Sequence, residues 1–137
     1  MPGYSGTPLP QKLGLKPKQR VGFFNLPAEV RSELKTSLAE CEIVTSGALD
    51  YAQLFTSSLA QLEKEFPRYT GRLRPDGLLW ASWPKKSSGV ATDVTEADVR
   101  RVGLACGLVD VKVCAVSDIW SGLKFVYRVK DRKKKSS

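Results

Sequence analysis

The stretch from Leu73 to Asp93 reads LRPDGLLWASWPKKSSGVATD, and it decides the fold class of this chain. Pro75, Asp76 and Gly77 are turn-forming residues, and the apolar run 78–83 that follows them is typical of a strand buried on both faces. A strand of that kind belongs to a sheet that is covered by helices on both sides. The sequence therefore predicts an α/β fold.

The predicted strand ends at Pro84 and opens into a loop with two cations, two hydroxyls and a glycine. These residues are Lys85, Lys86, Ser87, Ser88 and Gly89. Backbone N–H groups in a glycine-containing turn form a concave site for anions, and the ammonium groups add positive charge. Ligands of open α/β sheets bind outside the carboxyl ends of the strands. We therefore expect an anion site here, with a solvated loop that holds no ligand as the alternative.

The first half of the chain contains signals for three strands and three helices. Thr7 is placed to cap a helix over 8–13, and Gly14 is placed to end it. A further helix begins near Ser57 or Ser58, and Pro67 predicts that it is kinked or divided in two. The remaining segments are predicted strands at 20–26, 41–45 and 51–55 and a predicted helix at 27–39.

The second half contains one well-specified helix and two alternating strands. Thr95 and Asp98 form a pair resembling a capping box, and the helix they begin ends at Gly107. Apolar and polar residues alternate over 109–115 and 123–129. The short connection between these two strands excludes a helical crossover, which needs about a dozen residues, so they pair as a hairpin. We predict a sheet of about six strands in the order 2-1-3-4-6-5, with only the last strand antiparallel.

The hairpin connection supplies a second group of candidate ligand-binding residues. They are Trp120, Ser121, Gly122 and Lys124, and we expect them at the same end of the sheet as the loop 85–89. Trp120 is suited either to stack on a flat ligand or to cap the core. The amino-terminal residues Tyr4, Ser5, Gly6 and Thr7 are predicted to fold over this end as a lid, with an ordered terminal clasp as the alternative.

Length and charge predict one domain over 1–130 and a basic, disordered tail over 131–137. The chain has 137 residues and a net charge of +8. Residues 130–137 hold five basic residues and one acid, which is a local charge of 5 − 1 = +4. Such a tail binds nucleic acid weakly and without sequence preference. No apolar run suggests a membrane span or a signal segment, so we expect a cytoplasmic protein.

The residue types present exclude several kinds of active site. The chain has no histidine, so it lacks an ordinary base for neutral pH and any Ser–His or Cys–His nucleophile pair. Its three cysteines, Cys41, Cys106 and Cys114, have no CxxC spacing. We therefore expect no disulfide framework and no metal site. No catalytic residue can be named from the sequence.

The order of elements, with LRPDGLLWASWP ahead of a helix and a final hairpin, resembles the second half of class I S-adenosylmethionine methyltransferases. In that family a segment like LKPGG precedes the fifth strand, and the seventh strand is antiparallel. The resemblance covers most of 20–129, with one strand and one helix missing. It implies a truncated Rossmann-like sheet with helices on both faces.

The cofactor site is where the sequence departs from that family. Those enzymes need a glycine-rich turn after the first strand and an acid at the end of the second. Here the first strand runs into FFNLPA (23–28) without a glycine, and the second ends in VTSG (44–47). Asp50 is a substitute acid, but it lies after the turn. We therefore expect S-adenosylmethionine to bind weakly or not at all.

Whole motifs of the chain also resemble a bacterial family known only as a domain of unknown function. The matching segments are YSGTPLPQKLG, WPKKSSGVATD, GLVDVKVCAV and WSGLKFVYR. We predict a bacterial, non-catalytic methyltransferase-like domain without a cofactor that binds an anionic ligand or a protein partner. The alternatives are an S-adenosylmethionine-dependent methyltransferase with an unusual cofactor site and a nucleic-acid-binding module.

Overall fold

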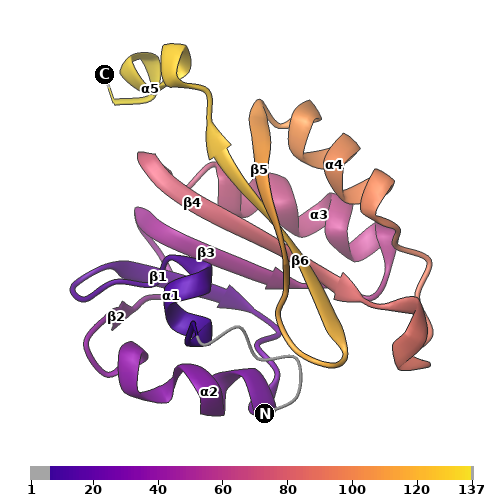
Figure 1. Ribbon diagram of the computed structural model, residues 1–137. Coiled ribbons are helices and arrows are strands. Elements are labelled where there is room, and N and C mark those ends of the chain that lie inside the picture. Colours follow the sequence, from indigo (N-terminus) through magenta and orange to yellow (C-terminus); the bar gives the residue numbers. More distant parts are fainter. Residues whose placement is uncertain (1–6, 137) are drawn as a thin grey trace.

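The computed structural model describes residues 7–136 and consists of one mixed sheet with helices on both faces (Figure 1). The strands are β1 (Arg20–Phe24), β2 (Glu42–Ile43), β3 (Leu49–Phe55), β4 (Leu73–Pro84), β5 (Leu108–Ala115) and β6 (Trp120–Tyr127). The helices are α1 (Leu9–Leu13), α2 (Ala28–Leu38), α3 (Leu59–Thr70), α4 (Glu96–Ala105) and α5 (Val129–Ser136), with a short 3-10 turn at Lys86–Ser88. No helix among the described residues is long and apolar enough to cross a membrane.

The strand order is β2-β1-β3-β4-β6-β5, which confirms the predicted topology. Strands β2, β1, β3 and β4 pair in parallel, and β6 runs antiparallel to both β4 and β5. The prediction succeeded because connection length restricts how neighbouring strands can pair. The parallel strands therefore direct their carboxyl ends towards the same side of the molecule.

Strand β4 begins earlier than predicted, and the predicted turn at 75–77 is wrong. Leu73 already pairs with Leu49 of β3, whereas the next pair joins Leu78 to Tyr51, so residues 74–77 form an irregularity inside the strand. A Cβ on Gly77 would lie 3.1 Å from the carbonyl oxygen of Asp50 and 2.9 Å from Leu73 Cδ1. Turn-forming residues here allow the strand to bulge and continue.

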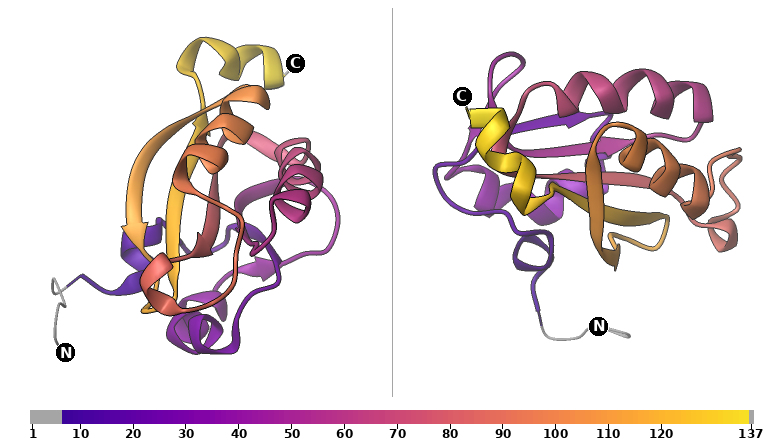
Figure 2. Two further views of the ribbon diagram at one scale, coloured as in Figure 1. Left: turned by 90° about the vertical axis from the view of Figure 1, so that its right-hand side faces the viewer. Right: turned by 90° about the horizontal axis from the view of Figure 1, so that it is seen from above.

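Two apolar layers cover the sheet, one on each face (Figure 2). Helices α3 and α4 cover one face, where the rings of Phe66 and Phe125 meet edge to face with centroids 5.2 Å apart. Helices α1 and α2 cover the other face, which includes the fully buried Tyr51, Phe55 and Trp80. The indole Nε1 of Trp80 donates a hydrogen bond to the Leu13 carbonyl at 2.7 Å, which fixes α1 against the sheet.

Strand β2 is much shorter than predicted, and its connection to β3 contains no helix. It consists of two residues that pair with Arg20 and Val21 at the beginning of β1. The chain then reaches Leu49 through residues 44–48 alone. A short connection suffices because β2 stops near the level at which β3 starts. We argued the strand order from helical connections between the first five strands, and this connection lacks such a helix.

Three terminal details also differ from the prediction. Pro8, not Thr7, is the N-cap residue of α1, and no side chain caps that helix. Pro67 lies in the last turn of α3, which is one helix and not two. Proline is tolerated there because the carbonyl that loses a donor is that of Glu63, a solvent-exposed residue. Residues 131–136, expected to be disordered, lie in α5.

Helix α4 packs closely on β6, and this contact generates a stability prediction. A Cβ on Gly103 would lie 2.6 Å from Phe125 Cδ2 and Cζ, inside van der Waals contact. We expect Gly103→Ala to lower the free energy of unfolding by about 1–3 kcal/mol, the usual cost of overpacking. Helix propensity favours the opposite sign by about 1 kcal/mol. Chemical denaturation measures the difference.

The control for this substitution is Leu104→Ala, at the next and partly exposed position of the same helix. We expect this substitution to change the free energy of unfolding by no more than about 0.5 kcal/mol. An alanine at position 103 that left stability unchanged or raised it would show that α4 does not need this close approach.

Candidate functional site at the carboxyl ends of the strands

The sheet has a topological switch point between β1 and β3. From β1 the chain continues to β2 on one side, whereas β3 pairs with β1 on the other side. In open α/β sheets ligands bind outside the carboxyl ends of the strands at such a point. The residues that follow β1 and β3 are therefore the first candidates for a ligand site. We call Asn25, Leu26, Ala28, Thr56 and Ser57 the switch-point residues.

The turn after β1 has an unusual backbone conformation. Asn25 has a φ of +56°, in the left-handed region that non-glycine residues rarely adopt. Asparagine tolerates this conformation better than other non-glycine residues because its short polar side chain can bond locally. Helix α2 then begins after Pro27, which provides no side-chain cap. Its first N–H groups are therefore available to an anion.

The residues after β3 are tied into the structure by several hydrogen bonds. The Thr56 N–H donates to the Ser82 carbonyl at 3.0 Å. The Thr56 side chain is 1% exposed, and its Oγ1 has no hydrogen-bond partner among the described residues. Ser58 caps α3 by accepting from the Gln61 N–H at 3.1 Å. These contacts hold the switch-point backbone in place and leave one buried hydroxyl unsatisfied.

A segment after the 3-10 turn closes over the start of α3. Asp93 Oδ1 accepts from the Leu59 N–H at 2.7 Å, and the Thr92 hydroxyl donates to the Ser57 carbonyl at 2.7 Å. Asp93 is therefore a second cap of α3. The true N-cap of α4 is Thr95, which forms the predicted reciprocal capping box with Asp98. Hydrogen bonds from the backbone N–H and hydroxyl of Thr95 lower the pKa of Asp98.

The predicted anion loop, residues 85–89, uses most of its polar groups internally. The Ser88 hydroxyl donates to the Lys85 carbonyl at 2.6 Å and accepts from the Val90 N–H at 3.2 Å. The N–H groups of Ser88 and Gly89 donate to Lys85 and Lys86 carbonyls. Lys86 and Ser87 are exposed. Anion binding at this loop stays a prediction, and it would rest on the exposed side chains more than on a cluster of backbone donors.

The structure brings this loop and Trp120 to one end of the sheet. Trp120 pairs with Pro84, and the Lys85 N–H donates to the Ile119 carbonyl at 2.7 Å. The Trp120 ring meets Phe55 edge to face with centroids 5.2 Å apart, so it packs against the core. Ser121 and Gly122 lie in β6 opposite Trp83 and Ser82, not in the hairpin turn as expected.

Lys124 does not join that group of residues. It lies opposite Trp80, four positions along β4 from Pro84. Burial lowers the pKa of Lys124, and the nearby charges of Lys112 and Lys16 lower it further. Of the predicted lid, Tyr4, Ser5 and Gly6 lie outside the described residues, and Thr7 is exposed.

The substitute acid, Asp50, lies at the wrong end of the sheet for a cofactor. Its carboxylate accepts from the Arg20 N–H at 2.8 Å and pairs with Arg74 at 3.0 Å, at the beginnings of β1 and β4. No acid follows β2 before β3 begins. Residues 7–136 also contain no group of three His, Cys, Asp or Glu side chains that could hold a metal.

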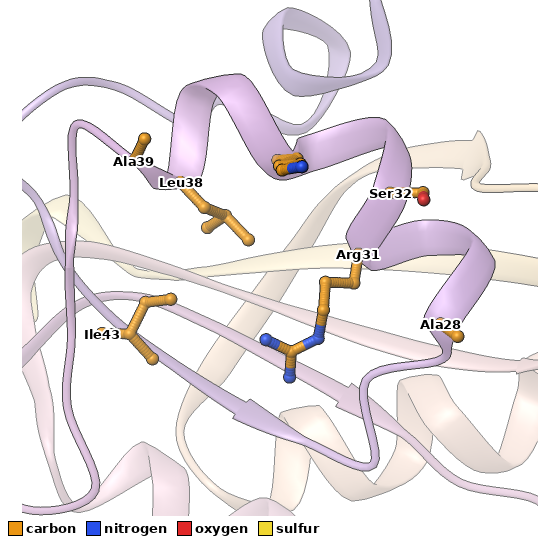
Figure 3. A pocket seen from close by; sticks show the side chains of 7 residues that line it. Ala28, Arg31, Ser32, Leu38, Ala39 and Ile43 are labelled. Carbon is orange, nitrogen blue, oxygen red and sulfur yellow. The ribbon is translucent and has the colours of Figure 1, made fainter.

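A groove runs along the edge of the sheet between α2 and β2 (Figure 3). It has a volume of about 320 Å³, and Leu38 and Ile43 face each other across it, with Arg31 extending from the helix. Ile43 is 52% exposed and lies in β2, the outermost strand of the sheet. The other lining residues are Ala28, Ser32, Lys35 and Ala39.

Sequence reasoning missed Asn25 and Thr56 as candidate site residues. The signal for Asn25 was present: an asparagine between a strand and the proline that precedes a helix is well suited to a left-handed turn. Thr56 had no comparable signal, because the sequence does not show that its hydroxyl is buried without a hydrogen-bond partner. Its place directly after the third strand did follow from the predicted strand 51–55.

Several solved structures that resemble this chain are methyltransferases. One is magnesium protoporphyrin IX methyltransferase from Synechocystis PCC 6803 with bound SAH, at a TM-score of 0.59, 13% identity and coverage of 82% of this chain and 75% of that one. Another is precorrin-6y C5,15-methyltransferase from Geobacter metallireducens GS-15, at a TM-score of 0.59 and 11% identity, with coverage of 88% of this chain and 86% of that one. A third is a SAM-dependent methyltransferase from Aquifex aeolicus, at a TM-score of 0.56 and 12% identity, with coverage of 84% of this chain and 85% of that one.

At these identities the comparison shows a methyltransferase-like, Rossmann-like fold, and it does not show an activity. No protein-family model matches the chain, and no curated protein matches it in sequence. The resemblance to the bacterial family of unknown function therefore stays a prediction.

The role of Asp93 as a cap gives a direct test of how this end of the molecule is held together. We expect Asp93→Ala to cost about 1 kcal/mol of unfolding free energy, whereas Asp93→Asn should cost much less, because asparagine is an equally good cap. Thermal unfolding of both variants checks this. Equal losses in the two variants would show that the carboxylate charge matters and the cap does not.

Proposed function

We propose that this chain binds S-adenosylmethionine at the switch point and is a methyltransferase with an unusual cofactor site. The observation that carries the proposal is the left-handed Asn25 in the turn between β1 and α2. This turn is glycine-rich in the methyltransferase family, and here Asn25 adopts the left-handed conformation that glycine adopts most readily. We therefore propose S-adenosylmethionine as a cofactor, where the sequence led us to expect none.

The residues of the switch point fit the amino-acid end of such a ligand. The uncapped first turn of α2 offers N–H donors and the positive end of a helix dipole to a carboxylate. Bound S-adenosylmethionine supplies a methyl group on a positively charged sulfur. The chain has no histidine, so the acceptor would be an atom with a free lone pair that needs no strong base.

The switch point fits the ribose of S-adenosylmethionine less well, and this supports a second candidate function. Strand β2 stops after Ile43, and no carboxylate follows it before β3. A non-catalytic methyltransferase-like domain that binds an anionic ligand or a protein partner would need no such acid. The two candidates differ in whether an adenosyl ligand binds at all.

Isothermal titration calorimetry with S-adenosylmethionine and S-adenosylhomocysteine separates the candidates. We expect saturable binding, and we expect Ala28→Glu to weaken it by about ten-fold, or 1.4 kcal/mol. A glutamate in the first turn suits the helix dipole, so the variant should fold, but it repels the ligand carboxylate. Thr36→Glu is the matched control, with the same charge change about 12 Å further along α2.

Two outcomes would count against the first candidate. The absence of binding at millimolar ligand would favour the non-catalytic domain. Equal affinity for the wild type and Ala28→Glu would show that any bound ligand lies elsewhere on the protein.

A further inference from the structure

Three lysines gather where α1 packs on β5 and β6. Lys112 and Lys124 are directly opposite each other in the β5–β6 pair. Lys112 Nζ donates to the Lys12 carbonyl at 3.4 Å, and Lys124 Nζ lies 3.8 Å from where a Cβ on Gly14 would be. The charge of Lys16, two residues beyond Gly14, lowers the pKa of Lys124. We call Lys16, Lys112 and Lys124 the lysine cluster.

The lysine cluster has no negative partner among the described residues. In every ion pair among the described residues the cation is an arginine. Like charges directly opposite each other on neighbouring strands destabilise a sheet. Partial burial of Lys124 adds to that cost, and it lowers the pKa of this side chain together with the neighbouring lysines. An arrangement that costs stability in the free protein needs another reason to be there.

The end of α1 explains only one of these lysines. Cations near a helix carboxyl end stabilise the last carbonyl groups, and Lys112 does so at Lys12. The next carbonyl, of Leu13, already accepts from Trp80 Nε1. The described hydrogen bonds therefore give Lys16 and Lys124 no role in capping α1.

We propose that the lysine cluster binds the phosphate groups of a small phosphorylated ligand. The ammonium groups of Lys112 and Lys124 lie at the carboxyl end of α1, and Lys16 follows that end in the chain, so the cluster suits a compact anion with two or more charges. A nucleic acid would need a longer basic track, and α5, which carries the basic tail, lies away from α1 (Figure 1). The cluster is distinct from the switch point, so this proposal does not depend on the proposed function.

The test is calorimetric titration of the full chain with inorganic pyrophosphate at low salt. We expect the double variant K112Q/K124Q to bind about ten-fold more weakly or worse, because it loses two charge-assisted contacts. The matched control is K35Q/K64Q, which removes two exposed lysines from α2 and α3 and should change affinity by less than about two-fold. Without ligand, K112Q/K124Q should melt at or above the temperature of the wild type.

Several results would overturn the proposal. Unchanged affinity in K112Q/K124Q, or equal loss in the control, would show that only net charge matters. A loss confined to K85Q/K86Q would place the anion at the loop 85–89. Duplex DNA that binds through Lys112 and Lys124 while pyrophosphate does not would identify a nucleic-acid surface.

Discussion

Strand β4 is hydrogen-bonded to β3 along one edge and to β6 along the other, and the rest of the structure depends on this double pairing. It joins the parallel half of the sheet to the hairpin. Its alternating side chains also reach both layers: Leu79 and Ala81 face α3 and α4, while Trp80 binds the end of α1. Without β4 the two halves of the sheet would share no strand pairing and would meet through side-chain contacts such as that of Phe66 with Phe125.

The second constraint is the short strand β2. Because it ends after two residues, the chain returns to β3 without a helix and without an acid at the carboxyl end of the sheet. The same truncation exposes Ile43 and leaves the groove beside α2 open. The short β2 strand thus goes together with the missing acid after it and with the open edge of the sheet.

Sequence reasoning found the features that depend on local chemistry or on connection length. The capping box of Thr95 and Asp98 is local, and the antiparallel hairpin follows from the short connection before β6. It failed where tertiary register decides. Strand β6 starts at Trp120 and not at Leu123, and this shift moves Lys124 from the hairpin turn to the middle of a strand. Likewise, Asp93 caps a helix that lies far from it in the sequence.

We propose that the ligand site lies at the carboxyl ends of β1 and β3. The most direct measurement is a ¹H–¹⁵N correlation spectrum of the full chain titrated with S-adenosylhomocysteine. The account predicts that amide signals of Asn25, Ala28 and Ser57 shift progressively, while those of Lys112 and Lys124 do not. No shifts up to millimolar ligand, or shifts confined to residues outside the switch point, would contradict it.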